Sequence, residues 1–307
     1  MKNLFWFSVI VFVSVGCSMD RATVSPGVPQ DRAAPCAAAP PAHVEDDSAA
    51  AIDDRRQMDR LLKESLRLRD AGQTVKMAAL IEQLKSGRCK LALAPAPPKS
   101  VLTGEAVYER AKGSVLVVGS PFKCEKCSKM HLGTATAFVI SAGGACVTNY
   151  HVVNEPKKET LTVMTLDGRV LPVRAVLAAS KPDDVAIVQV DGLGVRPLPL
   201  AGMAPVGTRV RVISHPENRF HTLTEGVVSR YSTFHRAGAE VPMMSITADY
   251  ARGSSGGPVL DDFGAVVGLV STTHSIYYDE KDGKQGNLQM VVKQCVPAAS
   301  VLKLVQP

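Results

Sequence analysis

From residue 101 onward, short apolar runs alternate with polar turns, a pattern that indicates β-strands. The runs fall into two sets of six. The first set covers 114–119, 134–140, 145–148, 161–166, 170–177 and 185–190, and the second covers 208–213, 220–228, 243–248, 258–261, 265–270 and 288–292. The segment "VPAASVLKLV" predicts a closing helix after Pro297. Short strands at such regular spacing favour antiparallel barrels over a parallel sheet.

Before residue 101 the apolar residues recur with a different period. Apolar or small residues recur at helical spacing in two stretches separated by Gly72, which predicts a helical hairpin within residues 51–93. The residues at that spacing are Met58, Leu61, Leu62, Ser65 and Leu68, then Val75, Ala78, Ile81 and Leu84. The helical hairpin has two possible roles. It binds a partner or a second copy of the chain, which makes an oligomer possible, or it packs on itself or on the main domain.

Segments rich in Ala and Pro separate the remaining parts of the chain. Residues 18–50 lack periodicity and predict an extended tether, and "APAPPKS" at 94–100 predicts a second linker. The predicted organisation is a signal peptide at 1–17, the tether, the helical hairpin, the linker, and a main domain at 101–307.

The first residues have the features of an export signal. Lys2 precedes an apolar run from Leu4 to Val15 that is short for a membrane span. The ending "SVGC" resembles a bacterial lipobox, which would make Cys17 the site of lipid attachment and anchor the chain to a membrane of the cell envelope. The alternative is an ordinary signal peptide that is cleaved nearby, with Cys17 incidental.

Six further cysteines follow Cys17: Cys36, Cys89, Cys124, Cys127, Cys146 and Cys295. An even number of cysteines in an exported chain favours disulfides, whose pairing the sequence does not decide. "CEKC" with His131 nearby resembles half of a zinc site, but a second pair of ligands at metal spacing is missing. The sequence therefore predicts disulfides, no metal and no cofactor.

The net charge and its distribution limit the kinds of partner that the chain is expected to bind. The formal net charge of +6 arises from 35 Lys and Arg against 29 Asp and Glu, and no basic cluster is interleaved with aromatic residues. Nucleic acid is therefore not an expected partner.

The segment "GSSGGPV", residues 253–259, supports neither a helix nor a strand, yet it leads into apolar strands. A backbone of this kind suits a loop shaped for chemistry around Ser255. A serine nucleophile needs a base, a group that orients the base, and donors for an oxyanion. "TNYHVV" supplies His151 after a short strand, and "DDVAIV" supplies Asp184 before an apolar strand, with Asp183 as its nearest rival.

These three segments, in this order, resemble the trypsin-like serine peptidases of chymotrypsin fold, in particular the HtrA/Deg-like bacterial branch. The resemblance covers roughly residues 105 to 305 and implies two packed six-stranded β-barrels with a cleft between them. It implies an acyl-enzyme mechanism with Ser255 as nucleophile, His151 as base and then acid, and Asp184 as the orienting group. The N–H groups of Gly253 and Ser255 would form the oxyanion hole.

The resemblance has departures. Ala135 and Ala137 stand where the family often has glycine, and no PDZ domain is expected after the closing helix. The favoured function is a serine endopeptidase that cleaves polypeptides. The alternative is a catalytically silent member of the fold that binds peptides.

Substrate preference rests on three residues. Asp249 lies six residues before Ser255, where trypsin has the acid that binds Arg or Lys side chains, so a pocket for basic residues is one expectation. Asp249 could instead make a structural loop contact. Thr272 and Thr273 are expected to line one wall of the cleft and to leave a pocket of medium size.

Overall fold

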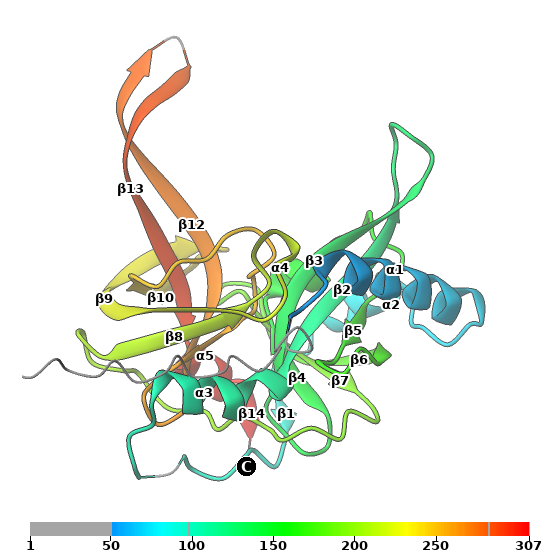
Figure 1. Cartoon of the computed structure of the whole chain (residues 1–307), viewed down its shortest axis with the longest axis horizontal. Coiled ribbons are helices and arrows are strands. Elements are labelled where there is room, and N and C mark those ends of the chain that lie inside the picture. The colour runs from blue at the N-terminus through cyan, green and yellow to red at the C-terminus, as the bar shows by residue number, and fades with distance from the viewer. Residues whose placement is uncertain (1–50, 98, 282, 307) are drawn as a thin grey trace, which may run out of the picture. The chain divides into compact units, whose positions relative to one another are not determined.

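The computed structural model describes residues 51–97, 99–281 and 283–306, which form two closed β-barrels with helices on their outer surface (Figure 1). The first barrel has the strand order β2-β3-β4-β7-β6-β5 and the second has the order β10-β13-β12-β11-β8-β9. Every pairing within the barrels is antiparallel. The predicted all-β class and the two sets of six strands are confirmed.

The strands of the first barrel are β2 (Val115–Lys123), β3 (Met130–Val139), β4 (Ala145–Thr148), β5 (Thr162–Met164), β6 (Val170–Ser180) and β7 (Val185–Val190). Those of the second barrel are β8 (Arg209–Ser214), β9 (Thr222–Arg236), β10 (Ala239–Ile246), β11 (Pro258–Leu260), β12 (Val266–Lys281) and β13 (Lys284–Pro297). The helices are α1 (Asp54–Asp70), α2 (Met77–Gln83), α3 (Gly104–Ala111), α4 (Tyr150–Val153) and α5 (Ala298–Leu302). Two 3₁₀ turns, η2 (Lys112–Ser114) and η3 (Pro216–Asn218), and a parallel pair of short strands, β1 (Cys89–Lys90) and β14 (Val305–Gln306), complete the structure.

Apolar side chains fill each barrel and the layer between them. Leu116, Val163 and Val188 belong to the core of the first barrel, and an analogous cluster fills the second. A third cluster joins the two, because Phe138 of β3 and Leu260 of β11 belong to it together. This shared core fixes the two barrels against each other, so residues from both can meet at one site.

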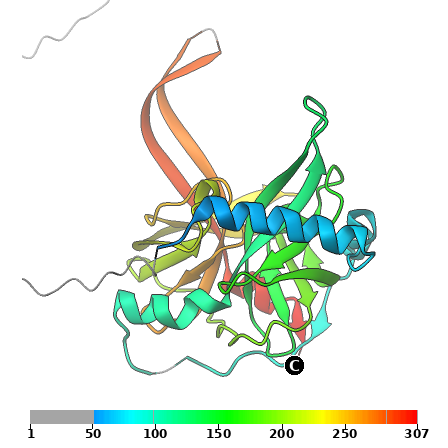
Figure 2. The same cartoon turned by 45° about the vertical axis from the view of Figure 1, so that its right-hand side comes forward.

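Helices α1 and α2 pack on the first barrel (Figure 2). Leu61 of α1 is fully buried in a cluster with Val117 and Met164, and Met77 and Leu80 of α2 belong to the barrel core. Both helices that the period predicted are present. Leu61 and Leu68 of α1 and Met77 and Leu80 of α2 are buried, whereas Ala78 of the predicted period is exposed. Of the two alternatives for this segment, the contacts favour packing on the main domain.

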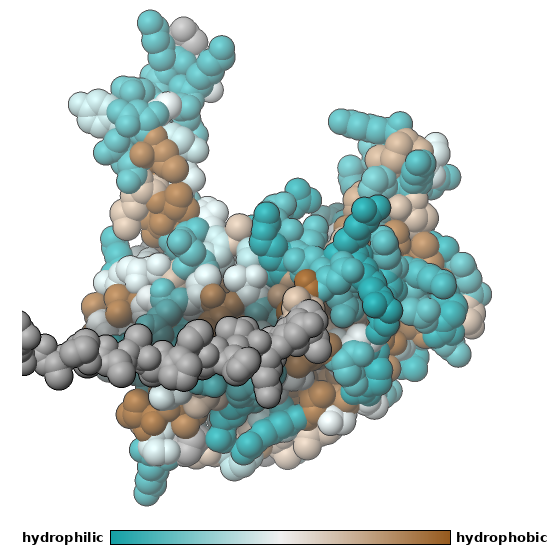
Figure 3. All heavy atoms as spheres, viewed as in Figure 1, coloured by the Kyte–Doolittle hydropathy of each residue, from teal (hydrophilic) through white to brown (hydrophobic). Residues whose placement is uncertain are grey.

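Two elements differ from the sequence-based expectation. Helix α3 lies in a stretch that was expected to be β-rich; Thr103 Oγ1 accepts a hydrogen bond from Ala106 N at its start, and Val107 and Ala111 are buried. Strands β12 and β13 continue beyond the barrel as a hairpin that stays paired as far as Lys281 and Lys284, with register shifts at Val270/Thr272 and Ile276/Tyr277. The hairpin stem exposes apolar side chains such as Ile276 and Met290 below a hydrophilic tip (Figure 3). Strand pairing, rather than burial, extends these two strands.

The five cysteines of the described residues carry free thiols. Cys146 and Cys295 are fully buried in different barrels, and burial raises the pKa of both thiols. The disulfides that the sequence predicted are therefore not found among these five residues. Cys17, Cys36, the predicted signal peptide and the predicted tether lie outside the described residues.

Within the described ranges, no helix combines the length and the apolar character that crossing a bilayer requires.

Candidate active site

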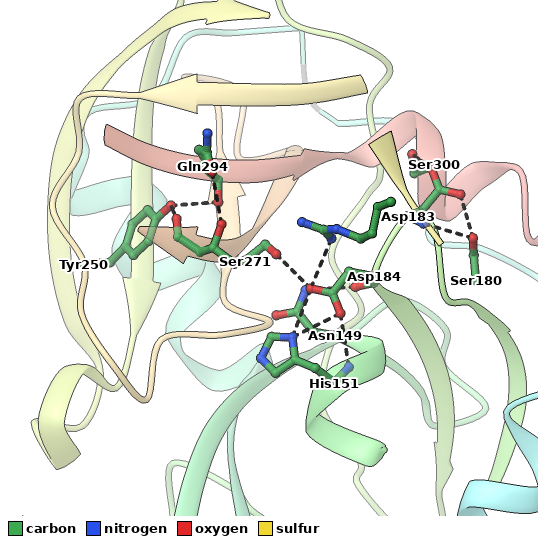
Figure 4. Close-up of polar contacts among 11 residues, drawn as sticks. Asn149, His151, Ser180, Asp183, Asp184, Tyr250, Ser271, Gln294 and Ser300 are labelled. Carbon is green, nitrogen blue, oxygen red and sulfur yellow. Dashed lines mark hydrogen bonds and ion pairs between the residues drawn. The ribbon is translucent and has the colours of Figure 1, made fainter. Parts of the chain in front are cut away.

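His151 and Asp184 are brought together by the first barrel. Strands β4 and β7 are neighbours, with Thr148 opposite Ala186, so the segment after β4 and the residue before β7 meet at one edge. His151 lies in the short helix α4 rather than at the strand end itself. Its Nδ1 is 3.0 Å from both Asp184 Oδ1 and Oδ2, and its backbone N–H donates to Oδ1 at 3.1 Å (Figure 4).

The Asp184 carboxylate is almost fully buried and receives further contacts. Ser271 Oγ of β12 donates to Oδ2 at 2.8 Å, and the Arg236 guanidinium lies 3.7 Å from the same oxygen. Asn149 Nδ2 donates to the Asp184 carbonyl at 2.9 Å. A buried carboxylate is costly unless it is hydrogen-bonded, and these contacts meet that need while they fix its direction toward His151.

The neighbouring Asp183 faces another way. It accepts hydrogen bonds from Ser180 Oγ and Ser300 Oγ, both at 2.6 Å (Figure 4). Asp184 has a left-handed backbone, with φ of 58°, which turns the two successive side chains apart. The structure thus brings Asp184, and not Asp183, to the imidazole.

Ser255 comes from the glycine-rich loop before β11, in the second barrel. The loop is held by Thr136 of β3, whose N–H donates to Ser255 O at 2.8 Å and whose Oγ1 donates to Gly253 O at 2.9 Å. Gly253 and Gly256 both have positive φ, and a Cβ atom would lie 2.4 Å from His215 O at Gly253 and 2.2 Å from Thr136 O at Gly256. Only glycine fits this backbone, which explains the composition of the loop.

His151, Gly253 and Ser255 line the same cavity, of about 390 Å³. The N–H groups of Gly253 and Ser255 have no hydrogen-bond partner within the described part of the chain, so they remain available to a ligand. No hydrogen bond joins Ser255 to the His151 ring among the described residues. Such bonds are often long in free enzymes and shorten when substrate binds.

The rest of the cavity wall carries charges of both signs, from Glu155, Lys158, Glu217 and Arg252. Burial lowers the pKa of Lys158, the positive charge of Arg252 lowers it further, and Glu155 opposes the change. Lys158 Nζ also lies 3.7 Å from the centre of the Phe122 ring. This part of the wall is therefore charged and polar.

The sequence model of the family described as "Trypsin-like peptidase domain" matches residues 135–269, a range that contains His151, Asp184 and Ser255. Over this range, which is less than half of the chain, the sequence is similar to trypsin-like peptidase domains.

Its relatives are proteases of the HtrA and Deg kind. "Protease Do-like 1, chloroplastic" of Arabidopsis thaliana is 30% identical over 154 residues, which cover 47% of this chain and 34% of that protein. "Probable periplasmic serine endoprotease DegP-like" of Halomonas elongata is 33% identical over 138 residues, covering 44% of this chain and 28% of that protein. The chain spans about a third of the length of the curated relatives that it matches.

Solved structures share the fold of the peptidase domain. The Rv3671c protease of M. tuberculosis in its active form has a TM-score of 0.51 and 24% identity, and covers 70% of this chain and 90% of that one. An HtrA-type protease with a decapeptide has a TM-score of 0.51 and 17% identity, with 66% and 65% covered.

The expected specificity residues lie apart from the cavity of the peptidase domain. The Asp249 side chain is 84% exposed and pairs with Lys293 at 3.3 Å, a loop contact on the protein surface. Thr272 borders a second hollow beside Asp184 and Arg236, and Thr273 is an exposed residue of β12. None of these three residues lines the cavity that His151 and Ser255 share.

The residues expected from the sequence did not include Ser271, Arg236 and Thr136, which contact Asp184 or the Ser255 loop. Ser271 and Asp184 are separated by 87 positions, and Thr136 and Gly253 by 117 positions. No local pattern marks such pairs, because only the packing of one barrel on the other brings them together. Ala135 and Ala137 flank Thr136 without conflict; Ala135 borders the cavity and Ala137 is fully buried in the core.

Two buried histidines lie beneath the Ser255 loop of the peptidase domain. His221 N donates to His215 Nδ1 at 3.0 Å, and His215 O is the atom that approaches Gly253. Burial lowers the pKa of both rings, that of His221 to about 4, so both are neutral near neutral pH. Both rings therefore contribute to packing beneath the loop.

Proposed function

We propose that this chain is a serine endopeptidase that hydrolyses peptide bonds through an acyl-enzyme, with Ser255, His151 and Asp184 as its catalytic triad. The observation that carries the proposal is a cavity lined by both Ser255 and an imidazole whose Nδ1 is bonded to a buried carboxylate. Because Nδ1 is engaged by Asp184, Nε2 is the nitrogen left to take a proton from the serine.

The reaction then follows from the groups around the cavity. Ser255 Oγ attacks the peptide carbonyl carbon while His151 Nε2 accepts the hydroxyl proton. The negative oxygen of the tetrahedral intermediate is stabilised by the N–H groups of Gly253 and Ser255, which no described residue engages. His151 returns the proton to the departing amine, which leaves an acyl ester on Ser255. A water molecule, deprotonated by His151, hydrolyses this ester and restores the hydroxyl.

The substrate of this reaction is a polypeptide, as the names of the related proteases suggest. One relative is named as periplasmic, which supports the proposal that this chain is exported. The proposal that Cys17 anchors it through a lipid rests on the lipobox-like ending "SVGC" alone.

The test is covalent labelling of the full chain with a fluorophosphonate probe, which reacts with an activated serine whatever the substrate. We expect the parent to be labelled and Ser255→Ala not to be labelled. His151→Ala should slow labelling by at least about 10³-fold, because the base is lost. Ser254→Ala is the matched control: this adjacent serine accepts a hydrogen bond from Ser214 Oγ, so labelling should persist without its hydroxyl.

Equal labelling of the parent and of Ser255→Ala would assign the reaction to another residue. A folded parent that is not labelled at all would contradict the proposal and favour a silent domain that binds peptides in the same cavity.

A further inference from the structure

The turn between β2 and β3 gathers two thiols and an imidazole. Cys124, Cys127 and His131 each offer one ligand atom, and these atoms all lie within 4.8 Å of one another. Cys127 Sγ is 3.0 Å from His131 Nε2. The hairpin projects from the first barrel (Figure 1), so the cluster is separate from the cavity that contains His151 and Ser255.

The backbone of the turn holds the three side chains in this arrangement. Cys124 N–H donates to Lys129 O at 2.9 Å, and Ser128 N–H donates to Cys124 O at 3.2 Å. Ser128 has a φ of 56°, which reverses the chain directly after Cys127. His131 is already part of β3, where it pairs with Phe122 of β2. The imidazole is thus held by the sheet, and the thiols are held by a closed turn.

Two thiols and an imidazole suit a borderline-soft divalent cation. Tetrahedral Zn²⁺, with Zn–S of about 2.3 Å and Zn–N of about 2.0 Å, separates its ligand atoms by about 3.5 to 3.8 Å. In the observed cluster Cys127 Sγ and His131 Nε2 are 3.0 Å apart, and no two of the three ligand atoms are more than 4.8 Å apart, so the cluster brackets this spacing. Two thiolates and a neutral imidazole also balance the charge of the ion.

We propose that Cys124, Cys127 and His131 bind one Zn²⁺ ion, with the fourth position open to water or to a side chain of a bound molecule. This proposal revises the sequence-based expectation of no metal. That expectation rested on the lack of a second ligand pair, whereas the strand register places His131 beside Cys127. Both thiols are free in the structure, and a disulfide between them would make no use of the adjacent imidazole.

Zinc at this turn would also act on the cavity. The residues that follow the cluster in β3, Leu132 to Ala135, line the cavity with His151 and Ser255. An ion that joins the turn to the start of β3 would hold this edge of the cavity in place. The inference does not depend on the proposed peptidase activity.

Cobalt titration of the full chain tests the site. We would use Ser255→Ala as the background, to prevent self-cleavage, and treat it with a chelator under reducing conditions before adding Co²⁺. We expect one Co²⁺ per chain, with the thiolate-to-cobalt charge-transfer band and the visible bands of tetrahedral cobalt, and displacement by one Zn²⁺. Cys124→Ser, Cys127→Ser and His131→Ala should each weaken binding at least about tenfold.

Matched controls are Cys89→Ser, which removes a thiol of the chain outside the turn, and His235→Ala, which removes an exposed imidazole. Both should bind Co²⁺ as the background does. A second readout is trypsin cleavage after Lys126 and Lys129, which zinc should slow in the background but not in Cys127→Ser.

Three results would overturn the proposal. They are the absence of the charge-transfer band, equal binding by Cys124→Ser and the background, and a disulfide between Cys124 and Cys127 in protein isolated without reductant.

Discussion

His151 and Asp184 come from the first barrel and bond directly to each other, whereas Ser255 comes from a loop of the second barrel whose N–H groups face a cavity. Every oxygen of the Asp184 carboxylate has a protein partner, so this half of the site is oriented without a ligand. The N–H groups of Gly253 and Ser255 have none among the described residues. One half of the site is satisfied internally, and the other half leaves donors for a ligand to satisfy.

This difference follows from what each half does in the proposed reaction. An imidazole that transfers protons must present one fixed nitrogen, which requires hydrogen bonds within the protein. An oxyanion hole must keep its donors free until charge develops on the substrate. The two halves are linked by contacts across the barrels, from Ser271 to Asp184 and from Thr136 to Gly253.

The largest expected loss of activity comes from disrupting the half of the site that contains His151 and Asp184. Asp184→Asn keeps the size of the side chain but removes the charge that orients the imidazole, and we expect kcat for a peptide substrate to fall by about 10⁴-fold. Asp183→Asn is the matched control, since Asp183 bonds to Ser180 and Ser300 instead. Steady-state kinetics of both variants would measure the difference. Similar losses in both would show that the orientation of His151 does not depend on Asp184 alone.

A smaller loss of activity is expected from changes in the Ser255 loop, whose N–H groups face the cavity. Gly253→Ala would place a Cβ atom 2.4 Å from His215 O, at a φ of 94°, so the peptide must rotate and move its N–H away from the cavity. We expect kcat/KM to fall by about 10² to 10³-fold, the effect of losing one oxyanion donor.

The control for this variant is Gly238→Ala in the β9–β10 turn. Gly238 also has a positive φ, of 78°, but nothing lies within 4 Å of the added Cβ. It should cost about 1 to 2 kcal/mol in the free energy of unfolding, from backbone strain alone, and leave kcat/KM near the parent value. If thermal melts and kinetics changed alike in the two variants, strain rather than the position of the donor would explain the loss.

The smallest effect is expected at the contact that links the two halves of the site. Ser271→Ala removes the hydroxyl with which the second barrel donates a hydrogen bond to Asp184. Because this hydrogen bond goes to a charged group, we expect its removal to lower kcat by about tenfold. KM should stay unchanged, because Ser271 does not line the cavity with Ser255. Ser271→Thr keeps a hydroxyl and should restore most of the rate. A loss in kcat that Thr does not restore would indicate a packing effect instead.

The sequence by itself determined the strands of both barrels, the two N-terminal helices and the Ser255 loop. These depend on local features: alternation of apolar residues, helical spacing, and the tolerance of glycine for positive φ. Helix α3 was missed although Thr103 offers a cap and Val107 and Ala111 share a helical face. The hairpin beyond the second barrel was missed because its strands are mostly exposed and carry little apolar alternation.

The resemblance already favoured Asp184 over Asp183 as the partner of His151, but only the tertiary structure shows why Asp183 turns away, which residues support Asp184, and where Asp249 lies. Asp183 and Asp184 are the same residue type in the same short segment, and their directions are set by a left-handed backbone and by partners as distant as Ser300 and Ser271. The same holds at the β2–β3 turn, where strand register brings His131 to Cys127. Local periodicity specifies elements, but the meeting of side chains far apart in sequence depends on how the barrels close and pack.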